Sequence, residues 1–283
     1  MNEHGVLTLS PQRTTTGELL SAAATRRGMR VEVLPSHGGT GTLGPLPAGN
    51  VHYYGGPRFA AGVVDDLGVA LLEPADGWLA ALPHAYTLRR VAEATLGEAR
   101  RLTRPAFVKP PSDKSFPPAV HADGGRLPCD GPGLSADTPV LISDVVTWEA
   151  EFRLFVLDGE VRTGSQYATF GRLDAVPLDG HRHRGAVLDF AAGLLGTCGD
   201  TLPSAVVVEV GLVTACEPGG ADGWAVVEAN MAWFSNCYAA DPDRALDVVL
   251  RSAGPRARLA GRDRPFCRAR DENPARLGAG RCP

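Results

Sequence analysis

Two apolar runs in the second half of the chain carry polar residues, and together they constrain the fold more than any other feature. Residues 205–211 read Ala-Val-Val-Val-Glu-Val-Gly, a pattern typical of a buried strand. The Glu209 carboxylate there must be paired, hydrogen-bonded or metal-bound, because burying an isolated charge is costly. Residues 224–230 predict a second strand, on which Glu228 and Asn230 point to the same face. If the two strands pair, all three polar residues face one cleft.

Three oxygen ligands on one face suit Mg²⁺ held jointly with a polyphosphate, since this cation binds one or two carboxylates together with substrate phosphates. Glu228 and Asn230 alone would be read more simply as a polar strand end. Lys109 ends the apolar run 106–109 and would supply a point charge for phosphate, although a lone strand-end lysine is normally solvated. Arg153 can fork onto a phosphate or carboxylate oxygen. The combination favours a site for Mg²⁺ and a nucleotide.

The composition excludes some classes of partner. At 283 residues, with 44% hydrophobic and 21% charged residues, the chain can bury a sizeable core. Its formal net charge of -4 gives no basic field to attract nucleic acid or anionic lipid. No apolar run approaches the roughly 18 residues of a membrane span, and no basic-then-apolar leader opens the sequence. We expect a cytoplasmic protein without nucleic-acid or membrane partners, whose six scattered cysteines are reduced.

The first 75 residues predict a small α/β lobe that opens with a βαβ unit. The sequence Gly-Thr-Gly-Thr-Leu-Gly at 39–44 formally matches a dinucleotide-binding fingerprint. That reading is rejected, because Pro45 and Pro47 prevent the helix that would hold the pyrophosphate. The expected elements of the lobe are strands at 6–9, 31–34, 51–54 and 69–72 and helices at 17–27 and 59–67.

The rest of the chain predicts a mixture of strands, helices and loops. Residues 78–102 have a helical pattern, whose arginines we expect mostly on solvated faces, although one of them could reach a phosphate. Asp158-Gly159 is a tight hairpin signal. Residues beyond 254 are rich in Arg, Pro and Gly and predict a poorly packed extension. The other expected elements are strands at 106–109, 140–142, 149–157 and 160–167, helices at 187–195 and 242–252, and loops at 121–138 and 171–186.

Five motifs together resemble the ATP-grasp superfamily in their order and approximate spacing, most clearly between about residues 105 and 240. Asp113-Lys114-Ser-Phe116 after the Lys-Pro pair, and the series Asn230, Ser235 and Tyr238, resemble the clade of that superfamily named for two arginines and a lysine. No single motif is specific, whereas the ordered set is fairly specific. The five motifs are Phe107-Val-Lys-Pro110, Leu141-Ile-Ser-Asp-Val-Val146, Glu151-Phe-Arg153, Val208-Glu-Val-Gly211 and Val227-Glu-Ala-Asn230.

The resemblance implies an α/β (α+β) chain with an ATP-grasp fold and a small N-terminal βαβ lobe. The expected division is a lobe at 1–75, a nucleotide-binding and catalytic region at 76–254 and a tail at 255–283. The family joins a carboxylate to an amine through an acyl phosphate, with ATP consumed. Two features depart from the family pattern. The metal position often filled by Asp is Glu209 here, and no compact glycine-rich phosphate loop is evident, so residues 111–138 could cover the nucleotide instead.

Carried over to this sequence, the resemblance assigns roles to particular residues. Lys109 would hold the ATP phosphates, with Lys114 as a second contact, and Arg153 would steady the transferring phosphate. Mg²⁺, with Mn²⁺ as an alternative, would bind the three oxygen ligands named above, Glu209, Glu228 and Asn230. The residues expected to contact the rest of the nucleotide are Ser143, Asp144, Val145 and Val146, which form the adenine hinge, and Glu151.

Several functions remain open at this point. The first hypothesis is a ligase that forms a peptide, isopeptide or other amide bond between small molecules, most simply amino acids. Alternatives are a ligase that modifies a protein side chain or terminus, a nucleotide-binding module without catalysis, and a kinase that stops at phosphoryl transfer. The oligomeric state is not predicted. Candidate substrate contacts, each equally compatible with a structural role, are Arg13, Tyr53, Arg58 and Tyr238.

Overall fold

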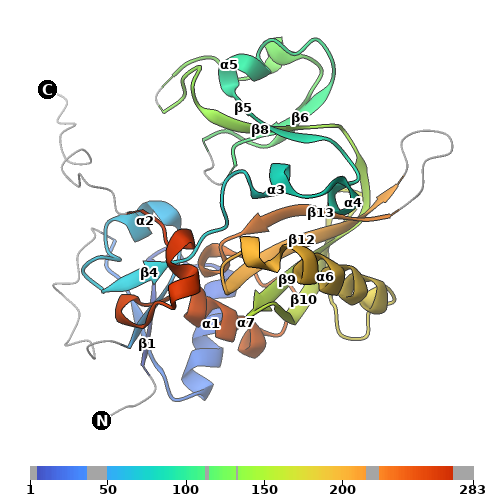
Figure 1. The fold of residues 1–283 in the computed structure, drawn as a ribbon. Coiled ribbons are helices and arrows are strands. Elements are labelled where there is room, and N and C mark those ends of the chain that lie inside the picture. Colours follow the sequence, from blue (N-terminus) through green and yellow to red (C-terminus); the bar gives the residue numbers. More distant parts are fainter. Residues whose placement is uncertain (1–4, 37–49, 112–114, 132, 215–222, 270–283) are drawn as a thin grey trace, which may run out of the picture.

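The computed structural model describes residues 5–36, 50–111, 115–131, 133–214 and 223–269 (Figure 1). The glycine-rich stretch at 39–44, for which the fingerprint is rejected, and Lys114 lie outside these residues. The described chain forms an N-terminal lobe, a four-stranded sheet above it in the view and a five-stranded sheet that joins the two. No helix among the described residues is long and apolar enough to cross a membrane.

The N-terminal lobe contains the predicted βαβ unit. Strand β1 (Val6–Leu9) lies between β2 (Arg30–Val33) and β3 (Val51–Tyr54) and pairs parallel with both. Helix α1 (Thr15–Arg26) crosses over from β1 to β2, and the Thr14 side chain caps it by accepting from the backbone N–H of Gly17. The carboxyl ends of β1 and β3 therefore lie beside the N-terminus of α1. The lobe also contains α2 (Pro57–Ala61) and β4 (Val69–Leu71).

The four-stranded sheet has the order β5-β8-β6-β7. The prediction of helix throughout 78–102 is wrong, because residues 91–95 form β5 and pair antiparallel with β8. Pairing with a strand distant in sequence overrides the local helical pattern there. The predicted loop at 121–138 is mostly irregular. The elements of this region are α3 (Trp78–Ala81), α4 (His84–Thr87), β5 (Val91–Thr95), α5 (Leu96–Ala99), β6 (Ala106–Lys109), β7 (Ala119–His121), η1 (Gly124–Arg126) and β8 (Pro139–Ser143).

The five-stranded sheet is antiparallel, with the order β11-β10-β9-β12-β13. The predicted turn at Asp158-Gly159 joins β9 to β10, and both of its residues have positive φ. The predicted loop at 171–186 is wrong in part, since residues 172–177 form the edge strand β11. The strands are β9 (Thr147–Leu157), β10 (Glu160–Thr169), β11 (Arg172–Pro177), β12 (Ala205–Thr214) and β13 (Gly223–Asn230).

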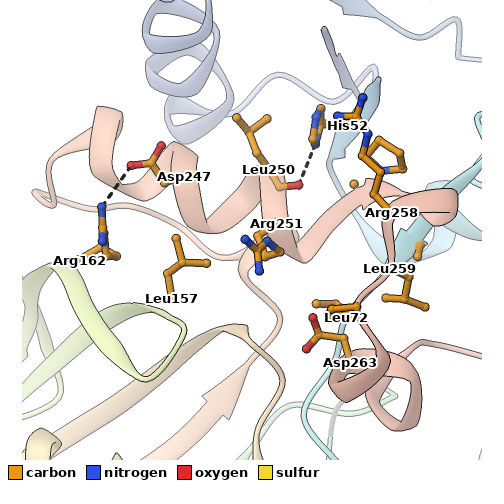
Figure 2. A pocket seen from close by; sticks show the side chains of 14 residues that line it. His52, Leu72, Leu157, Arg162, Asp247, Leu250, Arg251, Arg258, Leu259 and Asp263 are labelled. Carbon is orange, nitrogen blue, oxygen red and sulfur yellow. Dashed lines mark hydrogen bonds and ion pairs between the residues drawn. The ribbon is translucent and has the colours of Figure 1, made fainter. Parts of the chain in front are cut away.

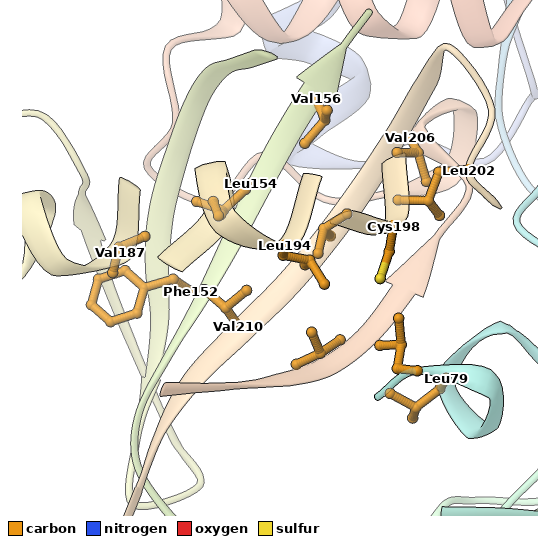
Figure 3. Close-up of a cluster of buried hydrophobic side chains, with 14 of the residues drawn as sticks. Leu79, Phe152, Leu154, Val156, Val187, Leu194, Cys198, Leu202, Val206 and Val210 are labelled. Atoms are coloured by element: carbon orange, nitrogen blue, oxygen red, sulfur yellow. The ribbon is translucent and has the colours of Figure 1, made fainter. Parts of the chain in front are cut away.

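Helices cover both faces of this sheet. On one face, Phe152 and Leu154 of β9 pack with Val206 of β12 against α6 (Arg184–Cys198), as Figure 3 shows. On the other face, the alternate residues Phe155 and Val207 pack against α1 and α7 (Pro242–Ser252). The period of two along each strand thus separates an α6 face from an α7 face. The 3-10 helices η2 (Gly199–Thr201) and η3 (Ala232–Phe234) precede and follow the β12–β13 pair.

The expectation of a poorly packed extension is wrong for residues 255–268. Strand β14 (Ala253–Pro255) pairs with β4, so the chain returns to the N-terminal lobe. It continues through η4 (Arg256–Arg258) and η5 (Gly261–Phe266). In η5 the Asp263 carboxylate is 1% exposed and accepts from both the backbone N–H and the hydroxyl of Ser204, each at 2.7 Å. A buried acid with two donors fixes this segment to the start of β12.

Candidate functional site

A cavity of 510 Å³ lies between the four-stranded sheet and the five-stranded sheet, and we call it the inter-sheet cavity. Most of the nucleotide and metal residues predicted from the sequence line it, although they come from five different strands and one connection. Those residues are Lys109, Ser143, Asp144, Val145, Val146, Glu151, Arg153, Glu209 and Glu228.

Glu209 is the centre of the polar network in the inter-sheet cavity. It is 2% exposed, and it lies opposite Arg153 on β9 and Glu228 on β13. Arg153 donates to Glu209 Oε1 through Nε at 2.9 Å, and Tyr167 donates to Glu209 Oε2 at 2.8 Å. Asn230 Nδ2 donates to Oε1 of Glu209 at 2.9 Å and to Oε1 of Glu228 at 2.6 Å. The buried carboxylate is therefore both paired and hydrogen-bonded, as its burial requires.

Lys109 reaches the network from the other sheet. Its Nζ donates to Glu228 Oε2, so one ion pair connects the end of β6 with β13. Burial alone would raise the pKa of Glu228, but the Lys109 ammonium, the Asn230 hydrogen bond and the Arg153 charge together outweigh it and hold that pKa below its usual value. Glu228 is consequently ionised at neutral pH. The Lys109 ammonium and the ionised Glu228 carboxylate therefore lie in contact where the two sheets meet at the inter-sheet cavity.

A β-bulge decides where Glu228 points. Glu209 pairs with Glu228, whereas Val210 pairs with Val226, so Val227 is an extra residue on β13. Val210 and Val226 belong to the core against α6. Without the bulge, strict alternation would turn Glu228 to that same apolar face, because it lies two residues from Val226. The bulge re-aims Glu228 onto the α7 face beside Glu209.

Arg89 holds this bulge and was not singled out by the sequence reasoning. It is 7% exposed, and its guanidinium donates to the carbonyl oxygens of Val226 at 2.8 Å and Val227 at 3.2 Å. It also lies 5.0 Å from the ring centroid of Trp148. Burial lowers the pKa of Arg89 to about 10, so it stays charged at neutral pH. The expected solvated face is wrong for this arginine, whose position before β5 carries no local sequence signal of a partner.

Replacing Arg89 by lysine is expected to lower stability and to displace Glu228. Lysine keeps the charge but cannot span two carbonyl oxygens with a planar fork, so we expect a loss of about 2–3 kcal/mol in the free energy of unfolding. If the chain uses Mg²⁺ and ATP as the sequence predicts, we also expect a several-fold higher Mg²⁺ concentration for half-maximal turnover, which a purely structural role would not produce. Denaturant titration and Mg²⁺-dependent ADP release measure these effects. The matched control, Arg101→Lys, should change stability by less than about 0.5 kcal/mol.

The connection between β8 and β9 forms the rim of the inter-sheet cavity. Asp144 is held there by Arg90 at 2.9 Å and Arg104 at 3.3 Å. The hydrogen bond from Arg90 lowers the pKa of this carboxyl. Within the described part of the chain, the backbone groups of Val145 and Val146 belong to no strand and make no backbone hydrogen bond. They can pair with the polar edge of a planar ring.

A family model of the ATP-grasp domain matches residues 86–248, and its description is family 2 of the clade named for two arginines and a lysine. The chain belongs to this family. The match confirms the resemblance and the ATP-grasp fold expected from the sequence. The matched range covers the four-stranded sheet, the five-stranded sheet and the first part of α7, and so it includes every side chain of the network described above. No match was found among curated proteins.

Solved structures with a similar fold include three ATP-grasp proteins. A RimK domain protein from Sphaerobacter thermophilus DSM 20745 is 18% identical, with a TM-score of 0.48, over 87% of this chain and 99% of that chain. D-alanine--D-alanine ligase from Bacillus anthracis is 10% identical, with a TM-score of 0.45, over 87% and 96%. The ATP-grasp ligase PsnB, complexed with a minimal precursor, is 12% identical, with a TM-score of 0.44, over 88% and 99%.

The donor set of this ATP-grasp domain fits a metal only with help from the nucleotide. The described residues contain no group of three or more His, Cys, Asp or Glu that could hold a metal ion. Glu209 and Glu228 supply two carboxylates, and Asn230 would have to turn its amide so that the oxygen faces them. Phosphate oxygens and waters would complete the coordination, as is usual for Mg²⁺. Lys109 forms an ion pair with Glu228, and Arg153 forms one with Glu209.

Glu151 and two tyrosines extend the network toward α7. The Tyr167 hydroxyl lies 2.8 Å from Glu151 Oε2 as well as from Glu209 Oε2, and its single hydrogen is donated to one of the two carboxylates at a time. Burial raises the pKa of Glu151, and the nearby charges of Glu209 and Glu228 raise it further, although the Tyr167 hydrogen bond acts in the opposite direction. Tyr238 stacks on Tyr167 with ring centroids 5.3 Å apart. The Glu151 carboxyl therefore takes up a proton more readily than an exposed one.

A second cavity, of 500 Å³, lies at the carboxyl ends of β1 and β3, beside the N-terminus of α1, and we call it the α1 cavity. Asn236 lines it, and the carbonyl oxygen of this residue accepts from Arg153 Nη1 at 3.2 Å. Arg153 therefore lies between the two cavities. Arg13 also lines the α1 cavity and is paired with Glu18 at 2.8 Å.

The remaining predicted substrate residues have different positions. Tyr53 is fully buried, and its hydroxyl donates to the carbonyl oxygen of Gly56 at 3.1 Å, so it packs in the N-terminal lobe instead of meeting a ligand. Arg58 is exposed on α2. Tyr238 lies under the Arg153 guanidinium, 4.9 Å from ring centroid to Cζ. Tyr238 thus contacts Arg153, Arg13 lines the α1 cavity, and Tyr53 and Arg58 line neither the α1 cavity nor the inter-sheet cavity.

Proposed function

We propose that this chain is an ATP-dependent carboxylate-amine ligase that forms an amide bond between small molecules, most simply amino acids. The observation that carries the proposal is the position of Arg153. Its guanidinium holds the central acid Glu209 of the inter-sheet cavity and the backbone of Asn236 at the α1 cavity. One cationic side chain can therefore contact both the phosphate being transferred and the carboxylate that receives it.

In this proposal the nucleotide occupies the inter-sheet cavity. The adenine edge would pair with the backbone of Val145 and Val146, while the phosphates would lie toward Lys109 and Arg153. Mg²⁺, or Mn²⁺ as an alternative, would be held by the acidic pair and Asn230 and would neutralise charge on the phosphates. Lys109 would leave Glu228 for the phosphates, since a phosphate competes well for a lysine ammonium at close range.

Two substitution steps would follow. A substrate carboxylate oxygen attacks the γ-phosphorus, the bond to the β–γ bridging oxygen breaks, and ADP leaves an acyl phosphate. An amine then attacks the acyl carbon, the C–O bond to phosphate breaks, and inorganic phosphate and a proton are released with the amide. Lys109 and Arg153 would stabilise the charge that develops in the first step, and preorganised electrostatics of this kind supplies most of the rate enhancement in phosphoryl transfer.

The carboxylate and amine substrates are proposed to enter from the α1 cavity. Its position at the carboxyl ends of parallel strands is where open α/β sheets usually bind ligands. Arg13 at its rim would contact a substrate carboxylate in exchange for Glu18, because the present pair is largely exposed and weak. A volume of 500 Å³ suits one or two amino acids.

The test is incubation with ATP, Mg²⁺ and pools of amino acids, followed by measurement of ADP and phosphate and by mass spectrometry of the products. The proposal expects at least one pool to raise ADP release well above the rate without substrate, together with a product equal in mass to two amino acids less water. A phosphorylated product without an amide would instead select a kinase. Modified proteins in a lysate would indicate a protein acceptor. ATP binding without turnover in any pool or lysate would indicate a non-catalytic nucleotide-binding module.

A further inference from the structure

A third cavity, of 430 Å³, shares no lining residue with the inter-sheet cavity or the α1 cavity. It lies where β3 and β4 of the N-terminal lobe, the turn end of β9 and β10, the last turns of α7 and residues 254–263 meet (Figure 2). We call it the arginine cavity. The proposed ligase function gives it no role.

Three arginines from three separate elements line the arginine cavity. Arg251, in the last turn of α7, lies between Arg162 of β10 and Arg258 of η4 in Figure 2. Arg251 Nη1 is 3.4 Å from Asp158 Oδ1, and Arg258 Nη1 is 3.4 Å from the side-chain oxygen of Asn50. Each guanidinium has five N–H donors. Among the described residues each of these two side chains has one such long bond, which leaves most of its donors available to a ligand.

The two acids of the arginine cavity are engaged elsewhere. Asp247 forms its close ion pair with Arg27 of the neighbouring helix at 2.5 Å and stands 4.0 Å from Arg162. Asp263 is 1% exposed and accepts two hydrogen bonds from Ser204. Neither carboxylate therefore neutralises Arg251 or Arg258 at contact distance. Asp158, which does not line the cavity, pairs with Arg251 at 3.4 Å, whereas Arg258 has no carboxylate partner among the described residues. The three arginines of the lining outnumber its two acids.

Four leucine side chains are among the other residues that line the arginine cavity. Leu72, Leu157, Leu250 and Leu259 come from four different segments and surround the guanidinium of Arg251 in Figure 2. The lining thus presents polar and apolar surface in comparable amounts. A small-molecule site uses both kinds of surface, apolar walls for contact area and a few polar groups for orientation.

We propose that the arginine cavity binds a small organic molecule that carries a phosphate group or a pair of carboxylates. The guanidinium groups of Arg251 and Arg258 take the oxyanion, because a planar fork pairs with two oxygen atoms at once. The apolar part of the ligand lies on the leucines. Because the walls come from the N-terminal lobe, the five-stranded sheet and residues 254–263, only the folded chain presents this site.

The test is calorimetric titration with inorganic phosphate and, separately, with succinate. The titrations use Lys109→Ala protein, which lacks the phosphate contact proposed for the inter-sheet cavity. At least one probe should bind with a Kd below about 1 mM. Adding Arg251→Gln and Arg258→Gln together should weaken that binding by at least about tenfold, since each removes charge-assisted hydrogen bonds. The probe that binds more tightly identifies the anion chemistry.

Arg184→Gln is the matched control, because Arg184 is also about half exposed, with a single ion pair at 3.5 Å. It should leave the Kd within about twofold. If the double variant does not fold, Arg258→Gln alone serves, since η4 is exposed, and it should weaken binding by several-fold. The proposal is overturned if neither probe binds Lys109→Ala protein or if the arginine variants bind as tightly as the Arg184→Gln control.

Discussion

Replacing Glu228 by glutamine is expected to lower the rate of ADP formation by at least about a thousandfold while the chain stays folded. The substitution keeps the shape of the side chain but removes the charge that would hold Mg²⁺ against the phosphates. Loss of a metal contact worth several kcal/mol in the transition state corresponds to a factor of this size. The Lys109 ammonium loses its ion pair, which we expect to lower the free energy of unfolding by about 2 kcal/mol.

A coupled assay of ADP release and a thermal melt followed by circular dichroism measure the two effects separately. Glu149→Gln is the matched control, because Glu149 lies on β9 of the same sheet and is about as exposed as Glu228. Among the described residues its ion pair is a 4.0 Å contact with Arg182. Glu149→Gln protein should retain near-normal turnover. Near-normal turnover in Glu228→Gln protein as well would contradict the proposal that β13 holds the metal.

Replacing Arg153 by lysine is expected to have the second largest effect. Arg153 donates to Glu209 through two nitrogens and to the Asn236 carbonyl through a third, with Tyr238 under its guanidinium. Lysine keeps the charge but cannot make this fork. We expect kcat for ADP formation to fall by about 10²-fold to 10³-fold, the range seen when one preorganised donor to a transition-state charge is removed.

Stability should fall as well, by about 2–4 kcal/mol, because Glu209 stays buried with fewer donors. Arg172→Lys on the exposed strand β11 is the control and should change neither quantity beyond error. Because Arg153 lies between the two cavities, we also expect the KM for the carboxylate substrate to rise in Arg153→Lys protein, together with the loss of kcat. A change in stability alone, with normal kinetics, would reduce Arg153 to a structural role.

The buried acid Glu209 made much of the site predictable from sequence. A carboxylate in an aliphatic strand needs partners, and the pairing of Glu209 with Glu228 and the nearby Asn230 is as expected. The five ordered motifs also led to the ATP-grasp fold, which the family match confirms. The roles of these residues toward nucleotide and metal stay predictions. Strand patterns and the order of motifs are visible in the sequence itself, so they can be predicted without knowledge of tertiary contacts.

The bulge at Val227 and its partner Arg89 could not be predicted in the same way. A bulge leaves no mark in a run such as Val-Val-Glu, and alternation would have placed Glu228 on the same face as Val226. Arg89 finds its carbonyl partners 137 residues further along the chain. The hydrogen bonds between Asp263 and Ser204 likewise join segments that are distant in sequence, so no local pattern predicts them. Contacts between distant segments overrode both the helical pattern at 78–102 and the loop-like composition beyond residue 254.

The most direct test of the central claim is a crystal structure with a non-hydrolysable ATP analogue and Mg²⁺. The account predicts the analogue in the inter-sheet cavity, with its adenine edge on the backbone of Val145 and Val146. Its phosphates should contact Lys109 and Arg153, and Mg²⁺ should lie between Glu228 and the terminal phosphates. An analogue bound elsewhere, with Lys109 still paired to Glu228, would contradict the account.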